Sequence, residues 1–460
     1  MRSTPFWTDG KVFALPYLLL LPAIALTTPV ACADEARLVR LAGTPEQIGT
    51  TWGEMNKDII VRDIEAVYLK KAAEAGLSRE ALLDRSAASV RIIREIAPHW
   101  IEEGAAIARA AGIDEDLYLA FMDGQSRNRF LHDDAGEAIV ECTSYAVSRD
   151  RTRDGAILFH KTRDNTDRPQ MAAILDSSRD GINKFITVTD AGAIRCSMMA
   201  NEKGLAGSGD YPAHRKKDSS TLLLEPADPE YRGIMGGNIL RHIAERASSC
   251  AEALAIIEDF VAQGYYAGGD VNGNHWLFVD REGTILEVCN NARHVVSQVH
   301  TNAVYFSHLN ESPAALRLRK SAEPISFDLF HSVSRDSSIC VKSSISGMTV
   351  EIDPNHPEML TCAWVALPTR GPVFPVFMGQ GGTPACLVDG SAYALGKKSP
   401  PQASRWETME QSMHAEKARL MEELTRSIAA GNPSEVHVER IEKWSSAQAA
   451  AIMEAISQAE

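Results

Sequence analysis

The hydrophobic periodicity of the chain changes near Ala138, and this change constrains the fold more than any other feature. From Asp34 to about Asp123, apolar residues recur at the spacing of amphipathic helices. After Ala138, short apolar runs alternate with polar, glycine-containing turns, as in the strands of a sheet. Helical periodicity returns from Ser404 to Ser457. This order predicts an α+β fold in which helices cover the sheets.

Local signals place the first elements within this pattern. Thr44 can cap a helix, Pro45 suits its first turn, and Gln47 completes a capping box. Further helices are expected after Ser78 and Pro98, within 230–261, and in the tail with a break at 431–433. Strands are expected at 143–147, 156–160, 184–189, 276–279, 284–288, 348–352 and 362–367.

Residues 1–33 have the features of a secretory signal peptide. A basic start precedes an apolar stretch from Val12 to Leu26, and Ala31-Cys32-Ala33 offers the small-x-small pattern that signal peptidase cuts. A membrane anchor is the weaker alternative, because Pro16 and Pro22 interrupt the apolar stretch and no other stretch approaches about 18 apolar residues. We therefore expect cleavage near Ala33, a periplasmic or secreted protein, and no membrane span in the mature form.

Charge and cysteine content exclude several classes of protein. The formal charge of −14 disfavours nucleic acid as a partner. Eight cysteines in 460 residues are too few for a disulfide scaffold, and no C-x-x-C pair is present. One cysteine leaves with the signal, so seven remain. Six of these are open to pairing or to burial as thiols (Cys196, Cys250, Cys289, Cys340, Cys362 and Cys386).

The sequence gives no indication of a metal or cofactor. There is no H-E-x-x-H motif, P-loop or G-x-S-x-G elbow. The thirteen histidines show no metal-like spacing, and we expect His99, His275 and His308 to be structural or surface residues. We therefore expect neither a metal nor a cofactor.

A candidate hairpin begins at Cys142. A strand over 143–147 and a second strand that ends at Asp164 are joined by a charged turn, so the two ends lie side by side in an antiparallel pair. A thiol needs a base to become a thiolate. If the bond between Glu141 and Cys142 is cut, the new α-amine is such a base, and Asp164 could orient it. The alternative is a buried structural cysteine beside a surface Asp/Lys pair.

The residues around this hairpin resemble the cysteine N-terminal-nucleophile (Ntn) hydrolases. The match consists of Cys142-Thr143-Ser144, an Asp-Gly turn, and a strand that ends in a basic residue, two others and Asp164. The chain resembles most closely the acyl-coenzyme A:6-aminopenicillanic acid acyltransferase family. Bile-salt hydrolases and N-acylethanolamine acid amidases are relatives. Lys161 and Thr162 replace the Arg and Asn that are usual in these families.

Further segments match in the same order along the chain. They are Asn201-Glu202-Lys203-Gly204-Leu205, His275 to Asp280, Thr301-Asn302, and Ser312-Pro313 with Arg317. The resemblance implies that Asn302 helps to form the oxyanion hole. It also implies that Lys161, Arg163, Tyr211 and Arg317 are substrate-binding residues.

The resemblance further implies a four-layer αββα sandwich and autocatalytic cleavage between Glu141 and Cys142. The expected parts are a signal peptide (1–33), a helical pro-region (34–141), a catalytic core (142–400) and a helical extension (401–460). The expected partners are a small-molecule amide substrate and the cleaved pro-chain, held as a heterodimer; a homo-oligomer is left open. Two other functions also stay open: an ester or phospholipid hydrolase on the same fold, and a non-catalytic periplasmic binding protein.

Overall fold

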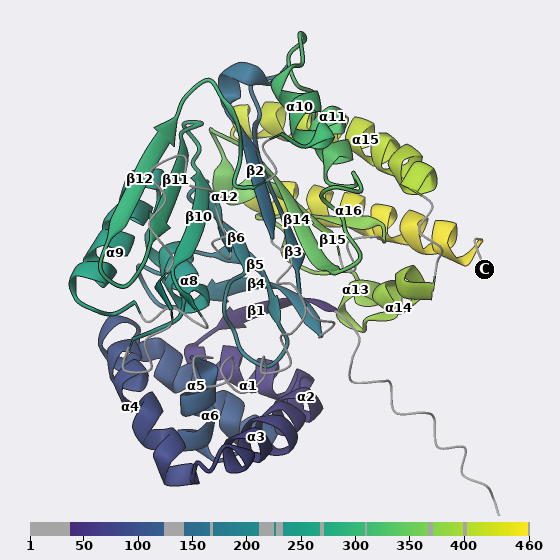
Figure 1. Cartoon of the computed structure of the whole chain (residues 1–460). Coiled ribbons are helices and arrows are strands. Elements are labelled where there is room, and N and C mark those ends of the chain that lie inside the picture. The colour runs from purple at the N-terminus through teal and green to yellow at the C-terminus, as the bar shows by residue number, and fades with distance from the viewer. Residues whose placement is uncertain are drawn as a thin grey trace, which may run out of the picture. The chain divides into compact units, whose positions relative to one another are not determined.

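Two β-sheets lie face to face in the middle of the molecule (Figure 1). The computed structural model describes residues 37–123, 142–165, 169–210, 225–226, 233–266, 271–308, 311–366, 371–398 and 403–458. All of them belong to one unit, Ala33–Glu460. The strand order is β1-β4-β5-β6-β7-β10-β11-β12 in the larger sheet and β13-β2-β3-β14-β15-β16 in the smaller sheet.

The strands have the following bounds. The larger sheet contains β1 (Arg37–Gly43), β4 (Gln170–Ser177), β5 (Phe185–Asp190), β6 (Met198–Asn201), β7 (Ala206–Asp210), β10 (Asn274–Val279), β11 (Ile285–Asn290) and β12 (Val295–His300). The smaller sheet contains β13 (Val304–Phe306), β2 (Thr143–Val147), β3 (Ile157–Asp164), β14 (Ser344–Ile352), β15 (Cys362–Ala366) and β16 (Val373–Phe377). A separate short pair consists of β8 (Glu225–Pro226) and β9 (Val271–Asn272).

Alternate residues of each strand fill the space between the sheets. Ile174 and Ile186 of the larger sheet join Phe159 and Met348 of the smaller sheet in one buried apolar cluster. Their neighbours along each strand point to the outer faces, as the two-residue period of a strand requires. Each sheet is therefore apolar on both faces and needs a covering layer of helices.

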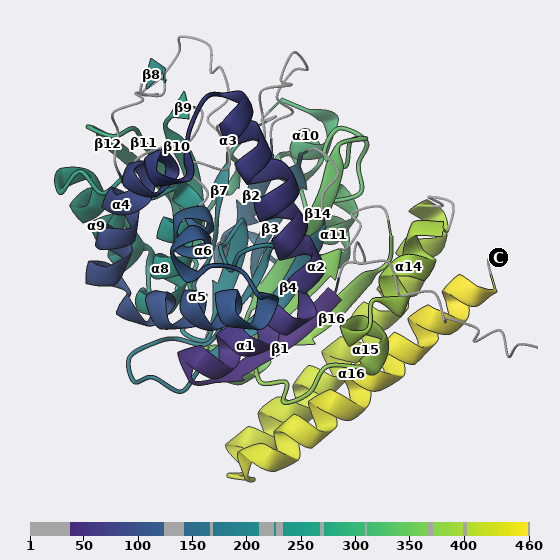
Figure 2. The ribbon, with the colours of Figure 1, turned by 90° about the horizontal axis from the view of Figure 1, so that it is seen from below.

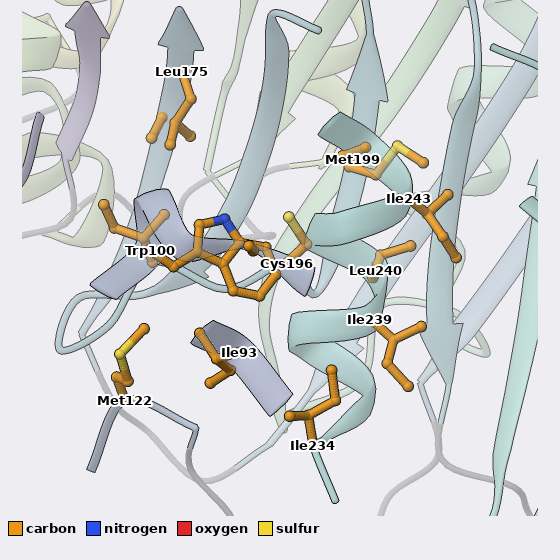
Figure 3. Close-up of a cluster of buried hydrophobic side chains, with 14 of the residues drawn as sticks. Ile93, Trp100, Met122, Leu175, Cys196, Met199, Ile234, Ile239, Leu240 and Ile243 are labelled. Atoms are coloured by element: carbon orange, nitrogen blue, oxygen red, sulfur yellow. The ribbon is translucent and has the colours of Figure 1, made fainter. Parts of the chain in front are cut away.

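Helices of the front and middle of the chain cover the outer face of the larger sheet. A single apolar cluster joins α1 (Pro45–Met55), α4 (Arg79–Ile96), α5 (Pro98–Ala111), α8 (Gly236–Arg246) and α9 (Cys250–Ala262) to this face. Figure 3 shows part of it, with Ile93 of α4, Trp100 of α5 and Leu240 of α8 gathered near Met199 of β6. The predicted capping box at Thr44 and Gln47 is present at the start of α1.

Two groups of helices cover the outer face of the smaller sheet. The first, α10 (Pro313–Arg319) and α11 (Phe327–Val333), packs against β2 and β13. The second is the C-terminal pair α15 (Ala403–Ala429) and α16 (Ser434–Ser457), which lie side by side in Figure 2. The Lys417 ammonium of α15 donates to Glu351 of β14 at 2.8 Å. The fold is thus α+β with four layers, αββα, as predicted.

The described chain contains further helical segments. They are α2 (Lys57–Val61), the π-helix Arg62–Leu69, α3 (Lys70–Glu74), α6 (Glu115–Met122), the 3₁₀ turn Arg149–Arg151, α12 (Pro357–Leu360), α13 (Ala385–Val388) and α14 (Ser391–Lys398). Of the described helices, none has the length and apolarity that crossing a membrane requires.

The helical front also contains a strand that the sequence did not predict. β1 pairs in parallel with β4 at the edge of the larger sheet. Leu38 packs into the inter-sheet cluster, whereas Val39 and Leu41 pack under the helices. A strand that is buried on both faces has a nearly continuous apolar run, so its period-two signal is weak. The segment 34–141 therefore supplies both helices and an edge strand.

Candidate active site

The predicted hairpin is present and places Cys142 beside the end of the second strand. Thr143 pairs with Thr162 and Ser144 with Lys161 in the antiparallel register of β2 and β3. Ser144 and Lys161 face the larger sheet, and Cys142 lies two residues before Ser144, on the same side. The Cys142 Sγ is 3.9 Å from the backbone oxygen of Asp164. As a whole residue, Cys142 is partly exposed.

A buried ion pair joins the two sheets behind the thiol. The Lys161 Nζ donates to Asp210 Oδ1 at 2.6 Å and to the backbone oxygen of Gly209. Both side chains are almost fully buried. Asp210 also accepts from the hydroxyls of Ser144, at 3.0 Å, and Ser307, at 2.7 Å. Burial raises the pKa of Asp210, but the positive charge of Lys161 lowers it more strongly. The pKa of Asp210 is therefore below its ordinary value.

Asp164 lies at the end of β3 and is buried. The Ser344 hydroxyl donates to its Oδ1. Burial raises the pKa of Asp164 to about 6, although the Ser344 hydrogen bond and the Lys161 charge act in the opposite direction. At neutral pH the Asp164 carboxylate is therefore mostly ionised and can hold a nearby cation or amine.

The surroundings of Cys142 favour a protonated thiol. Burial raises its pKa above the ordinary value, and the charges of Asp210 and Asp164 add to this effect. The positive charge of Lys161 acts against it. Because a thiol in this state is a weak nucleophile, the site needs a base that takes the proton as the sulfur attacks.

Arg163 lies next to this group but is held by the larger sheet. Its guanidinium donates to Asp190 at 2.7 Å and to Gln170 at 2.9 Å. Of the residues predicted from the sequence, the structure therefore brings together Cys142, Lys161, Arg163 and Asp164. Glu141 and Tyr211 lie outside the described residues.

Asn302 does not lie near Cys142. It occupies the turn before β13, with a positive φ of 49°. Val304 pairs with Val147, and the Ser148 amide donates to the oxygen of Ala303, so Asn302 lies beyond the far end of β2. At about 3.3 Å per residue, this position is about 20 Å from Cys142. The register therefore argues against the predicted oxyanion role of Asn302.

Arg317 is also separated from the thiol. It belongs to α10, which packs on the outer face of the smaller sheet, whereas Cys142 faces the inner side. Its guanidinium donates to the Ser332 hydroxyl at 2.6 Å. The structure thus does not bring Arg317 to the predicted substrate site.

Sequence reasoning missed the polar residues that β7 and the segment just after β13 contribute. Asp210, Ser208 and Ser307 surround Lys161 and Ser144, and the Ser144 and Ser208 hydroxyls lie 2.7 Å apart. A signal was present, because Ser208 and Asp210 alternate with glycine at the period of a strand. The seven cysteines from Cys142 onward are all described, and no disulfide joins any two of them.

Comparison with known proteins finds similarity only among solved structures. No protein-family model and no curated protein matches the chain. The structure is similar to an N-acylethanolamine-hydrolyzing acid amidase ortholog from Caenorhabditis elegans (10% identity, 47% of this chain and 94% of that chain, TM-score 0.33). Penicillin V acylase from Agrobacterium tumefaciens is 15% identical, with 52% of this chain and 86% of that chain covered and a TM-score of 0.32. A variant of conjugated bile acid hydrolase from Clostridium perfringens is 13% identical, with 52% of this chain and 92% of that chain covered and a TM-score of 0.33. With TM-scores this low, these similarities assign no activity to this chain.

Proposed function

We propose that this protein is an exported, self-processing amide hydrolase with Cys142 as its nucleophile. The observation that carries the proposal is the position of the Cys142 thiol. It lies at the start of β2 on the inner side of the sandwich, within reach of the Asp164 backbone and of the Lys161 charge. A structural cysteine has no need of an acid–base group beside it.

Processing comes first in this proposal. The Cys142 sulfur attacks the carbonyl carbon of Glu141, the peptide C–N bond breaks, and the acyl group moves to sulfur. Water then hydrolyses the thioester, which gives a Glu141 carboxylate, a thiol and a new α-amine on Cys142. The segment 34–141 stays bound, because β1 is paired with β4 in the larger sheet.

Turnover uses the groups that processing creates. The α-amine takes the thiol proton as the sulfur attacks the substrate amide, and it returns the proton to the leaving amine. Asp164, ionised at neutral pH, holds the α-amine by a charge-assisted hydrogen bond. Lys161, oriented by Asp210, stabilises the thiolate. Water resolves the acyl-thioester, since transfer to a second amine requires a bound acceptor that excludes water.

The intact mass of the exported protein tests the processing step. We expect two chains, with the larger one beginning at Cys142. Cys142→Ala should give one chain that begins near residue 34 and lacks activity. Cys386→Ala, which removes another partly exposed thiol, should be processed normally. An active wild-type protein that remains one uncleaved chain would refute the proposal.

Matched substrates test the reaction class. Amide and ester substrates with the same acyl groups, offered to the processed protein, should show turnover of the amides with burst formation of an acyl-enzyme. Turnover of the esters alone would instead support an ester or phospholipid hydrolase. No turnover together with a Cys142 that resists alkylation would support a binding protein.

A further inference from the structure

A group of side chains of the types that bind metals lies on the inner face of the larger sheet, apart from the Cys142 site. His275 belongs to β10, Glu287 and Cys289 to β11, and His300 to β12. The potential ligand atoms of His275, Glu287 and Cys289 all lie within 4.8 Å of one another. Glu287 Oε1 is 2.9 Å from His275 Nε2, and Oε2 is 3.3 Å from His300 Nε2. Two adjacent strands therefore bring three donor groups together, and His300 of the third strand contacts the second oxygen of Glu287.

The strand register explains this convergence. His275 is the direct partner of Cys289, and Glu287 lies two residues before Cys289 on the same face. His300 pairs with Ile285, so it also faces inward, diagonal to Glu287. Figure 1 shows the three strands side by side at one edge of the sheet. The sequence spacing of the ligands follows the hairpins and matches no metal motif, which is why composition and spacing gave no indication of a metal.

The burial of the group suits a bound divalent cation. The side chain of His275 is 2% exposed, that of Glu287 11% and that of His300 15%. These side chains therefore lie in an environment that has little water.

We propose that His275, Glu287, Cys289 and His300 form a binding site for a divalent transition metal of the Zn²⁺ class. Two imidazoles, a carboxylate and a thiolate are the donors that Zn²⁺ prefers, whereas Ca²⁺ and Mg²⁺ prefer oxygen ligands. In a tetrahedral site, ligand atoms lie about 3.5 Å apart, so His275, Glu287 and Cys289 need to move by only about 1 Å. The Cys289 thiol loses its proton when the metal binds.

Neighbouring groups support such a site. Tyr305 of β13 forms a hydrogen bond with Glu287. Its ring stacks on the His300 ring, with 4.0 Å between the ring centroids. Hydrogen bonds of this kind orient metal ligands from outside the coordination sphere. Tyr305 belongs to the smaller sheet, so a bound metal would connect the edge of one sheet to the other. Four protein ligands leave no position for substrate, which indicates a structural site.

Cobalt(II), which replaces zinc and absorbs light, tests this proposal on the full-length protein after treatment with a chelator. We expect one equivalent of Co²⁺ to give a thiolate-to-cobalt absorption band and tetrahedral d–d bands, which Zn²⁺ abolishes by competition. Cys289→Ser should remove the thiolate band. Cys142→Ala and Cys386→Ser should retain it, because these thiols lie outside the site.

A second ligand variant keeps the test valid if Cys289→Ser fails to fold. His300→Ala, at the sheet edge, should weaken Co²⁺ binding more than about tenfold, because loss of an outer-sphere partner alone costs about 10–100-fold. Zn²⁺ should raise the Tm of the wild type and of Cys142→Ala, and not that of His300→Ala. A band that survives Cys289→Ser but is lost in Cys142→Ala, or the absence of stoichiometric binding, would overturn the proposal. The amidase activity plays no part in this test.

Discussion

Lys161 and Asp210 form a buried ion pair that joins the two sheets, with Lys161 Nζ 2.6 Å from Asp210 Oδ1. Lys161 lies on β3 of the smaller sheet and Asp210 on β7 of the larger sheet. Neither charge is in contact with bulk water, so each one depends on the other and on nearby hydroxyl groups for stabilisation. The pair therefore fixes the distance between the sheets at the point where Cys142 lies.

Removal of one partner of this pair should destabilise the protein strongly. We expect Lys161→Met or Asp210→Leu to lower the free energy of unfolding by about 3–5 kcal/mol, because an uncompensated charge stays buried. Urea denaturation followed by circular dichroism measures this loss. Lys203→Met, at an exposed turn, is a matched control and should change the free energy of unfolding by less than about 0.5 kcal/mol.

The double variant separates the ion pair from simple packing. Lys161→Met combined with Asp210→Leu should cost much less than the sum of the single changes, since no charge remains buried. Additive losses would contradict a strong interaction between the two side chains. Whatever its stability, the double variant should be poorly active, because the charge beside the Cys142 thiol is gone.

The acid limb of the activity profile should report Asp164. Its pKa is raised to about 6, so kcat/KM should fall as the pH drops through this value and the carboxylate is neutralised. Ser344 donates a hydrogen bond that favours the carboxylate. Ser344→Ala should therefore raise the pKa further and move the acid limb upward by about one to two pH units.

Ser346→Ala is the control for this pH experiment. Ser346 lies two residues away on β14 and is also buried, but its hydroxyl donates to Gln170 at 3.0 Å. We expect its acid limb to coincide with that of the wild type. If the acid limb of kcat/KM in Ser344→Ala also coincides with that of the wild type, Asp164 is not the group whose titration controls activity.

The C-terminal helices should contribute to the stability of the whole molecule. Leu424 of α15 is fully buried in the same cluster as Trp364 and Val376 of the smaller sheet. Leu424→Ala should therefore cost about 2–5 kcal/mol, through lost burial and the cavity that remains. One cooperative denaturation transition at a lower urea concentration would confirm that the α15–α16 pair belongs to the core. An early separate transition would show that this helical pair unfolds alone.

Local features of the fold could be predicted from the sequence, and long-range ones could not. The β2–β3 hairpin was predictable because its strands are neighbours in the chain, and this pairing sets Lys161 and Asp164 beside Cys142. The placement of Asn302 depends on where the chain crosses from one sheet to the other, which no local pattern encodes. Asp210 pairs with Lys161 across 49 residues, so only the packing of the sheets reveals it.

Arg241 links the N-terminal helix α5 to helix α8 by buried ion pairs. It lies on α8, is buried, and forms two hydrogen bonds of 2.7 Å with the Glu103 carboxylate of α5. Its Nε donates to Glu245 at 2.9 Å, and Glu245 also accepts from Trp100 Nε1 of α5. Arg241→Met would leave the Glu103 carboxylate buried without its cation.

We therefore expect Arg241→Met to lower the free energy of unfolding by about 3–5 kcal/mol. Arg246→Met is the matched control on the same helix, because Arg246 is exposed and donates to the backbone oxygen of Gly181 at 3.1 Å. If the chain is cleaved before Cys142 as proposed, the small chain should dissociate from Arg241→Met at a lower urea concentration than from the wild type, as native mass spectrometry can measure. Equal stability of the two arginine variants would show that helix packing alone holds the front of the chain in place.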